Sequence, residues 1–168
     1  MARSTLEHFW SLFDTTYRVL GESAPRLTND AYAVRTFEVA RAMGDVALSL
    51  RESLGRVEAT SPEALEAVLN ESVAGDDSGA LAMYCFSSVV GSRLLVSLRD
   101  ARELSELSEE ETALLSGASG AVLAEVVSVG EVARSQGPIE DDVWVERARS
   151  LNRRLEDAGY AESFGYSR

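Results

Sequence analysis

Apolar residues recur at every third or fourth position along almost the whole sequence, and this spacing restricts the chain to helices. In the segment 30–57, for example, the apolar positions are Phe37, Ala40, Met43, Ala47, Leu50, Leu54 and Val57. Such a repeat places apolar side chains on one face of a helix, whereas a half-buried strand needs alternation at every second position. No segment alternates in that way for long enough to indicate a strand. The sequence therefore predicts an all-α protein.

Capping residues and helix breakers divide this pattern into five long helices and one short one. Ser4 with Glu7, and Ser108 with Glu111, have the spacing of a capping box, and Gly159 is a typical helix stop. The expected helices cover about 4–21, 30–57, 62–73 (the short one), 79–104, 109–135 and 140–158. Because the loops between them are short, successive helices should run antiparallel, as in an up-and-down bundle. We expect one domain over 1–159 and an aromatic C-terminal tail over 160–168.

Two of these helices are almost free of charge. The segment 79–98 (GALAMYCFSSVVGSRLLVSL) carries only Arg93, and 112–130 (TALLSGASGAVLAEVVSVG) carries only Glu125. A stretch of about 20 apolar residues can cross a membrane, but one charge in each segment would cost several kcal/mol there. No basic flank or tryptophan belt marks a membrane interface. We therefore expect a central apolar hairpin (about 79–104 and 109–135) inside a soluble bundle, with no membrane insertion.

Small residues at four-residue spacing suggest how the two arms of this hairpin meet. They are Ser116, Gly120, Ala124 and Ser128 on the second arm, and Ser88 and Ser92 on the first. Small side chains let helix axes approach closely, so we expect an antiparallel pair through these faces. A turn near Leu107 would set Arg93 opposite Ala121. Glu125, one turn further along, would then be within reach of Arg93. A charge in a covered helix needs a partner, which predicts an Arg93–Glu125 pair or a network including both.

Two interpretations of this pair are open at the sequence level. It can be a structural ion pair that fixes the register of the helices. Alternatively, Arg93 and Glu125 line an internal polar pocket with Tyr84, Cys85 and Ser88, which could bind a small apolar or anionic ligand. Cys85 itself is expected to be a buried, inert thiol, because no histidine lies near it in the sequence to lower its pKa.

The aromatic tail suggests a second kind of site. Tyr160, Phe164 and Tyr166 fall within seven residues, which is uncommon in a disordered terminus. They would pack across a groove on their own subunit or on a neighbouring one. Trp10 and Phe13 on the first helix are the expected partners, which makes these five aromatic residues a candidate interface.

Composition excludes several classes of function. Acidic residues number 28 against 16 basic ones, all arginine, and the net charge is −12. This negative field opposes binding to nucleic acids and to anionic lipids. His8 is the only histidine and Cys85 the only cysteine, so we expect no metal site, no cofactor and no disulfide. The N-terminal segment lacks a signal-peptide pattern, which favours a cytoplasmic protein.

These observations favour a broad class of function, but they do not indicate a chemical reaction. No catalytic motif is evident, so enzymatic activity is uncertain and we lean against it. The sequence favours a non-enzymatic, cytoplasmic helical bundle that acts through protein–protein contacts and forms a homo-oligomer. The alternative is a small-molecule binding or sensor bundle, with its pocket near Arg93 and Glu125.

Overall fold

The computed structural model is built of helices and loops, and it describes residues 2–57, 61–135 and 142–164, apart from the side chains of 2–4 and 142–144. No strand occurs in these three ranges, which confirms the all-α prediction. The elements are α1 (Ala2–Ser23), the 3₁₀ turn η1 (Ala24–Arg26), α2 (Asp30–Leu54), α3 (Glu63–Ala74), α4 (Ala80–Cys85), the π-helical turn η2 (Phe86–Val90), α5 (Gly91–Leu104), α6 (Glu109–Ser135) and α7 (Asp142–Asp157).

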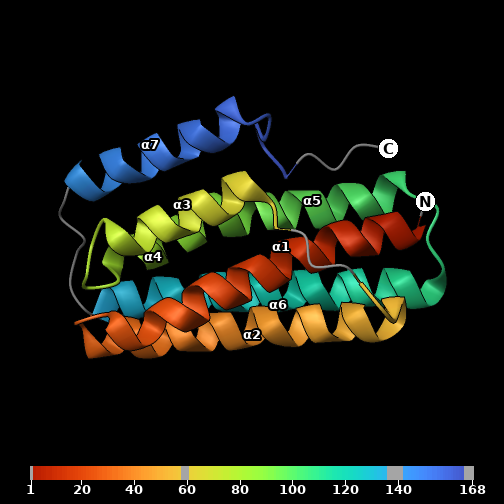
Figure 1. The fold of residues 1–168 in the computed structure, drawn as a ribbon, viewed down its shortest axis with the longest axis horizontal. Helices are drawn as coiled ribbons and strands as arrows, with labels where there is room; N and C mark the ends of the chain where they lie inside the picture. Colours follow the sequence, from red (N-terminus) through yellow and green to blue (C-terminus); the bar gives the residue numbers. More distant parts are fainter. Residues whose placement is uncertain (1, 58–60, 136–141, 165–168) are drawn as a thin grey trace.

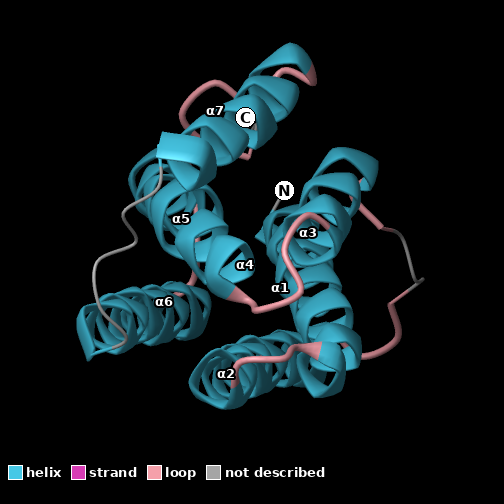
Figure 2. Cartoon of the chain, turned by 90° about the vertical axis from the view of Figure 1, so that its left-hand side faces the viewer, coloured by secondary structure: helices cyan, strands magenta, loops and turns pink. Residues whose placement is uncertain are grey.

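Successive helices run in opposite directions, as expected for an up-and-down bundle (Figure 1). Seen from the end, α2 and α6 lie at one side of the bundle and α7 at the other (Figure 2). The helices α1, α3 and α4–α5 lie between them and enclose the core, whose largest side chains are fully buried. Among these are Phe9, Phe13, Met43 and Phe86.

Local capping signals place several helix ends where the sequence predicts them. At the start of α6 the Ser108 N–H donates to Glu111 Oε1 over 2.9 Å, and the Glu111 N–H donates to Ser108 Oγ over 3.1 Å, which is a capping box. Gly159 has φ +95°, and the Tyr160 N–H closes the end of α7 on the Leu155 carbonyl over 2.8 Å. The end of α2 differs from the prediction. It stops at Leu54 because Gly55 takes φ +75°, a left-handed conformation that ends the helix before Val57.

The expected apolar hairpin is formed by α4–α5 and α6, which pack antiparallel. A Cβ on Gly91 would lie 2.7 Å from Val126 Cγ2, so this glycine allows α6 to approach closely. Gly91 follows η2, a π-helical turn inside an otherwise continuous helix, which the spacing of the sequence does not indicate. The Arg102 guanidinium also reaches Ser116 Oγ over 3.2 Å near the loop that joins the two arms.

The two arms of this hairpin are covered very differently. The most apolar window of Ala80–Leu104 is 67% buried, as the core helix of a bundle should be. The corresponding window of α6 is only 22% buried, because α6 lies at the edge of the bundle with α2 and α5 on its inner side (Figure 2). The expectation that both arms lie inside the bundle therefore holds for the first arm alone.

Candidate functional site

The Arg93 side chain is buried, and it binds the chain's own C-terminal segment. Only 4% of Arg93 is exposed. Its guanidinium donates to the carbonyl oxygens of Tyr160 (3.1 Å), Ala161 (3.0 Å) and Val89 (3.1 Å). Burial lowers the pKa of Arg93, and the negative charge of Glu156 opposes this shift. The position that the sequence assigned to a ligand is thus occupied by residues 160 and 161.

Glu125 has a different partner, so the predicted Arg93–Glu125 pair is wrong. Glu125 lies on the side of α6 that faces α2 and forms an ion pair with Arg35. Arg35 also pairs with Glu38 over 2.6 Å. Burial raises the pKa of Glu125, and the charge of Arg35 only partly offsets this. The pair fails because α6 turns Glu125 toward α2, whereas α5 turns Arg93 toward the segment that follows α7.

The other predicted ligand-binding residues do not converge on one cavity. Cys85 is fully buried, Tyr84 is half-buried, and Ser88 is exposed to solvent. Burial raises the pKa of the Cys85 thiol to about 12, with the positive charge of Arg93 acting in the opposite direction. A thiol with such a pKa carries almost no thiolate at neutral pH, so Cys85 is unsuited to nucleophilic chemistry.

The aromatic residues of the predicted interface pack inside the chain. Trp10 is 6% exposed, and Phe13 and Phe164 are fully buried. The Tyr160 and Phe164 rings meet edge to face at 5.6 Å between centroids. The Phe164 N–H donates to Ser97 Oγ over 2.8 Å, which fixes the tail against α5. The tail thus lies on its own subunit, one of the two arrangements expected, and Tyr166 falls outside the described residues.

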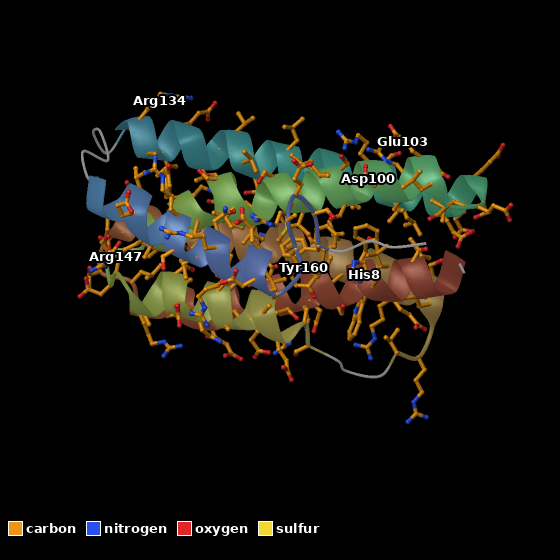
Figure 3. The ribbon with its side chains drawn as sticks, turned by 90° about the horizontal axis from the view of Figure 1, so that it is seen from above. His8, Asp100, Glu103, Arg134, Arg147 and Tyr160 are labelled. Carbon is orange, nitrogen blue, oxygen red and sulfur yellow. The ribbon has the colours of Figure 1, made fainter. Side chains whose placement is uncertain are left out.

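His8 lies beneath the same tail segment. In Figure 3 the labelled His8 and Tyr160 lie close together, near the middle of the molecule. Burial lowers the pKa of His8, and a hydrogen bond with the backbone of Phe164 acts in the opposite direction. Groups of three or more histidine, cysteine or acidic side chains that could hold a metal ion do not occur in the described part of the chain.

Two open grooves flank α2. The groove between α1 and α2 has a volume of about 640 Å³ and is lined by apolar residues such as Tyr17, Phe37 and Leu48. Its arginines are balanced by acidic residues on the same walls. The groove between α2 and α6 has a volume of about 520 Å³ and includes Ala113, Leu114 and Gly117. None of the five predicted ligand-binding residues lines either groove.

The most unusual surface of the molecule is the side of α6 that points away from the bundle. We call it the outer face of α6, and it consists of Ala113, Ser116, Gly117, Gly120, Leu123, Ala124 and Val127. Leu123 is 54% exposed and Val127 is 52% exposed. A Cβ built on Gly117 or on Gly120 would have no atom within 4 Å, so these two glycines do not serve contact with α5. The small-residue spacing was visible in the sequence, but the direction in which it points was not.

α6 itself places no charge on this face over five helical turns, and the Arg102 guanidinium of α5 reaches the face at Ser116. From Thr112 to Gly130 the only charged residue is Glu125, which lies on the α2 side and is paired there. By length and composition alone, both Ala80–Leu104 and α6 are apolar enough to cross a membrane, which is weak evidence for a span. No protein-family model, curated protein or solved structure matches this chain.

Proposed function

We propose that this protein acts in the cytoplasm through protein–protein contacts, without chemistry of its own, and that the outer face of α6 is its contact surface. The observation that supports the proposal is an exposed, uncharged helix face on a chain of net charge −12. Exposed apolar surface of this extent costs free energy in water, which association with another protein recovers.

The composition of the face favours a helix as its partner. Gly117 and Gly120 leave the backbone of α6 bare, with open space where a side chain would stand. Such positions allow a second helix to come close and make many van der Waals contacts. A helix that lies on a membrane instead presents bulky apolar residues flanked by lysine or arginine. The outer face of α6 is rich in small residues and begins at three glutamates, Glu109 to Glu111.

The alternative function, binding of a small molecule near Arg93 and Glu125, receives less support. The two residues have separate partners, and the Arg93 guanidinium already donates hydrogen bonds to backbone carbonyls of the tail. A ligand would have to displace this segment before it could reach Arg93.

A pair of matched substitutions tests the contact surface. Leu123→Glu introduces a charge at the centre of the outer face, and Leu48→Glu introduces the same charge at an equally exposed position beside the α1–α2 groove. The exposed fractions are 54% and 57%, and both residues lie within long helices. We expect the wild-type protein and Leu48→Glu to associate in sedimentation velocity experiments. Leu123→Glu should sediment as a monomer with unchanged helicity.

Two results would contradict the proposal. One is that Leu123→Glu associates as strongly as Leu48→Glu, because the contact would then lie elsewhere. The other is that the wild-type protein floats with phosphatidylcholine vesicles while Leu123→Glu does not, because the face would then bind lipid rather than protein.

A further inference from the structure

The two ends of the outer face of α6 carry opposite charges. The helix begins with Glu109, Glu110 and Glu111, and Arg134 lies in its last turn. Among the described residues, neither Glu109 nor Arg134 takes part in an ion pair. Figure 3 shows Arg134 near one end of the molecule and the acidic residues Asp100 and Glu103 of α5 toward the other. The acidic end of the helix pair is therefore far from the basic one.

These charges lie in line with the uncharged stretch between them. At 100° per residue, Glu109, Ser116, Val127 and Arg134 fall within about 20° of one another around the α6 axis. All four are exposed. A second helix that follows the outer face therefore meets an acidic group first, then about five turns of small and apolar residues, and finally the basic Arg134, with the exposed Glu131 one turn before it.

This inference rests on the proposed function, and it identifies the partner. We infer that the outer face of α6 binds the same face of a second copy of this chain, with the two α6 helices antiparallel about a two-fold axis between Gly120 and Leu123. That arrangement sets Arg134 of one copy level with Glu109 of the other, twice by symmetry. The same rotation brings Ser116 level with Val127, and Gly120 level with Leu123.

Charge complementarity selects this arrangement over a parallel one. In a parallel pair the Glu109 side chains of the two copies would face each other at one end, and the two Arg134 side chains would meet at the opposite end. Like charges in contact destabilise a helix pair, and parallel helix dipoles add to the repulsion. In the antiparallel pair Glu131 comes level with Thr112, a polar residue that tolerates a neighbouring carboxylate.

The size of the face sets the strength of the contact. From Thr112 to Gly130 it is about 27 Å long at 1.5 Å per residue and about 10 Å wide, or roughly 300 Å² on each copy. Stable complexes bury about 800 Å² on each partner. The dimer is therefore a weak one that forms and dissociates with protein concentration.

Cysteine cross-linking distinguishes the two orientations. The native thiol does not interfere, because Cys85 is fully buried and its pKa is about 12. In the antiparallel pair Ser116 of one copy lies beside Val127 of the other, whereas the two Ser116 residues are about 17 Å apart along the axis. Ser116→Cys and Val127→Cys proteins are mixed and treated with a short bismaleimide. The mixture should give a cross-linked dimer containing one chain of each variant, and neither variant alone should cross-link.

The other outcomes separate this inference from the proposed function. Efficient cross-linking of each variant with itself would overturn the antiparallel arrangement and leave a contact at the outer face intact. If no species cross-links and sedimentation shows a monomer, self-association itself is refuted, and with it the second copy as partner.

A charge exchange gives an independent check. Arg134→Glu should weaken dimerisation roughly threefold to tenfold, the range expected for two exposed ion pairs. Adding Glu109→Arg in the same chain should restore it, because the pairs re-form with their signs exchanged. A double variant that associates no better than Arg134→Glu would overturn the pairing.

Discussion

Replacement of Arg93 by methionine should release the C-terminal segment while the bundle stays folded. Arg93 holds residues 160 and 161 through two hydrogen bonds of 3.1 Å and 3.0 Å from its guanidinium to their carbonyl oxygens. Methionine fills a similar volume and has no donor, so it removes these bonds without leaving a large cavity. The substitution therefore separates the role of Arg93 as an anchor for the tail from its role in filling space.

The free energies involved make this a sensitive test. Ordering of the five residues 160–164 costs about 5 kcal/mol at about 1 kcal/mol each. The two bonds from Arg93 return about 3 kcal/mol, the bond from the Phe164 N–H to Ser97 about 1 kcal/mol, and the burial of the Phe164 ring about 2 kcal/mol. Docking of the tail is thus favoured by only about 1 kcal/mol. Loss of the Arg93 bonds should make the released state about thirtyfold more populated than the docked one.

Nuclear magnetic resonance of Phe164 reports the docked fraction directly. In the wild-type protein its ring lies in the core, 5.6 Å from the Tyr160 ring, and its amide proton is bonded to Ser97. In Arg93→Met the Phe164 shifts should move close to random-coil values, while urea unfolding loses only about 1 kcal/mol. Arg99→Met on the same helix is the matched control, because Arg99 is exposed and pairs only with Asp100. Unchanged Phe164 shifts in Arg93→Met, or equal changes in the control, would refute the reasoning.

Two further predictions follow from buried ionisable groups. Cys85, with a pKa of about 12, should not react with a thiol reagent at pH 8 in the folded protein and should react at once in denaturant; rapid reaction of the native protein would show that the helix α4 opens. Glu125 has a raised pKa, so the folded protein takes up its proton more readily than the unfolded chain does. Its contribution to stability therefore rises as the pH falls through the folded pKa and is complete below the ordinary value of 4.5. Urea unfolding at pH 7 and pH 4 should show the wild-type protein gaining stability relative to Glu125→Gln on acidification, and parallel changes in the two proteins would contradict this.

The features that could be predicted from the sequence depend on neighbours within about one and a half helical turns. The Ser108–Glu111 box and the stop at Gly159 are of this kind, because their hydrogen bonds join residues at most five positions apart. The helix spacing and the antiparallel order followed from equally local rules. The π-helical turn Phe86–Val90 was missed, since its residues are ordinary helix formers and nothing in their order indicates the extra residue in the turn.

The predicted site was wrong because it depended on which face of each helix a residue occupies in three dimensions, and the sequence does not indicate that. Arg93 and Glu125 lie on helices that do pack together, but their side chains leave the contact in different directions, one toward the tail and one toward Arg35. Gly117 and Gly120 of α6 likewise point away from α5. Both errors arose from the assumption that the two arms of the hairpin are each other's main partners. In the structure Glu125 instead pairs with Arg35 of α2, and Arg93 binds the tail.

Native mass spectrometry of the unmodified protein tests the central claim, contact between copies through α6, most directly. Across a wide range of protein concentration, we predict a growing species of two 18.2 kDa chains that carries no additional mass. A single chain at every concentration would contradict self-association. A small-molecule mass that is lost on denaturation would instead support a ligand-binding bundle and contradict the function proposed for this protein.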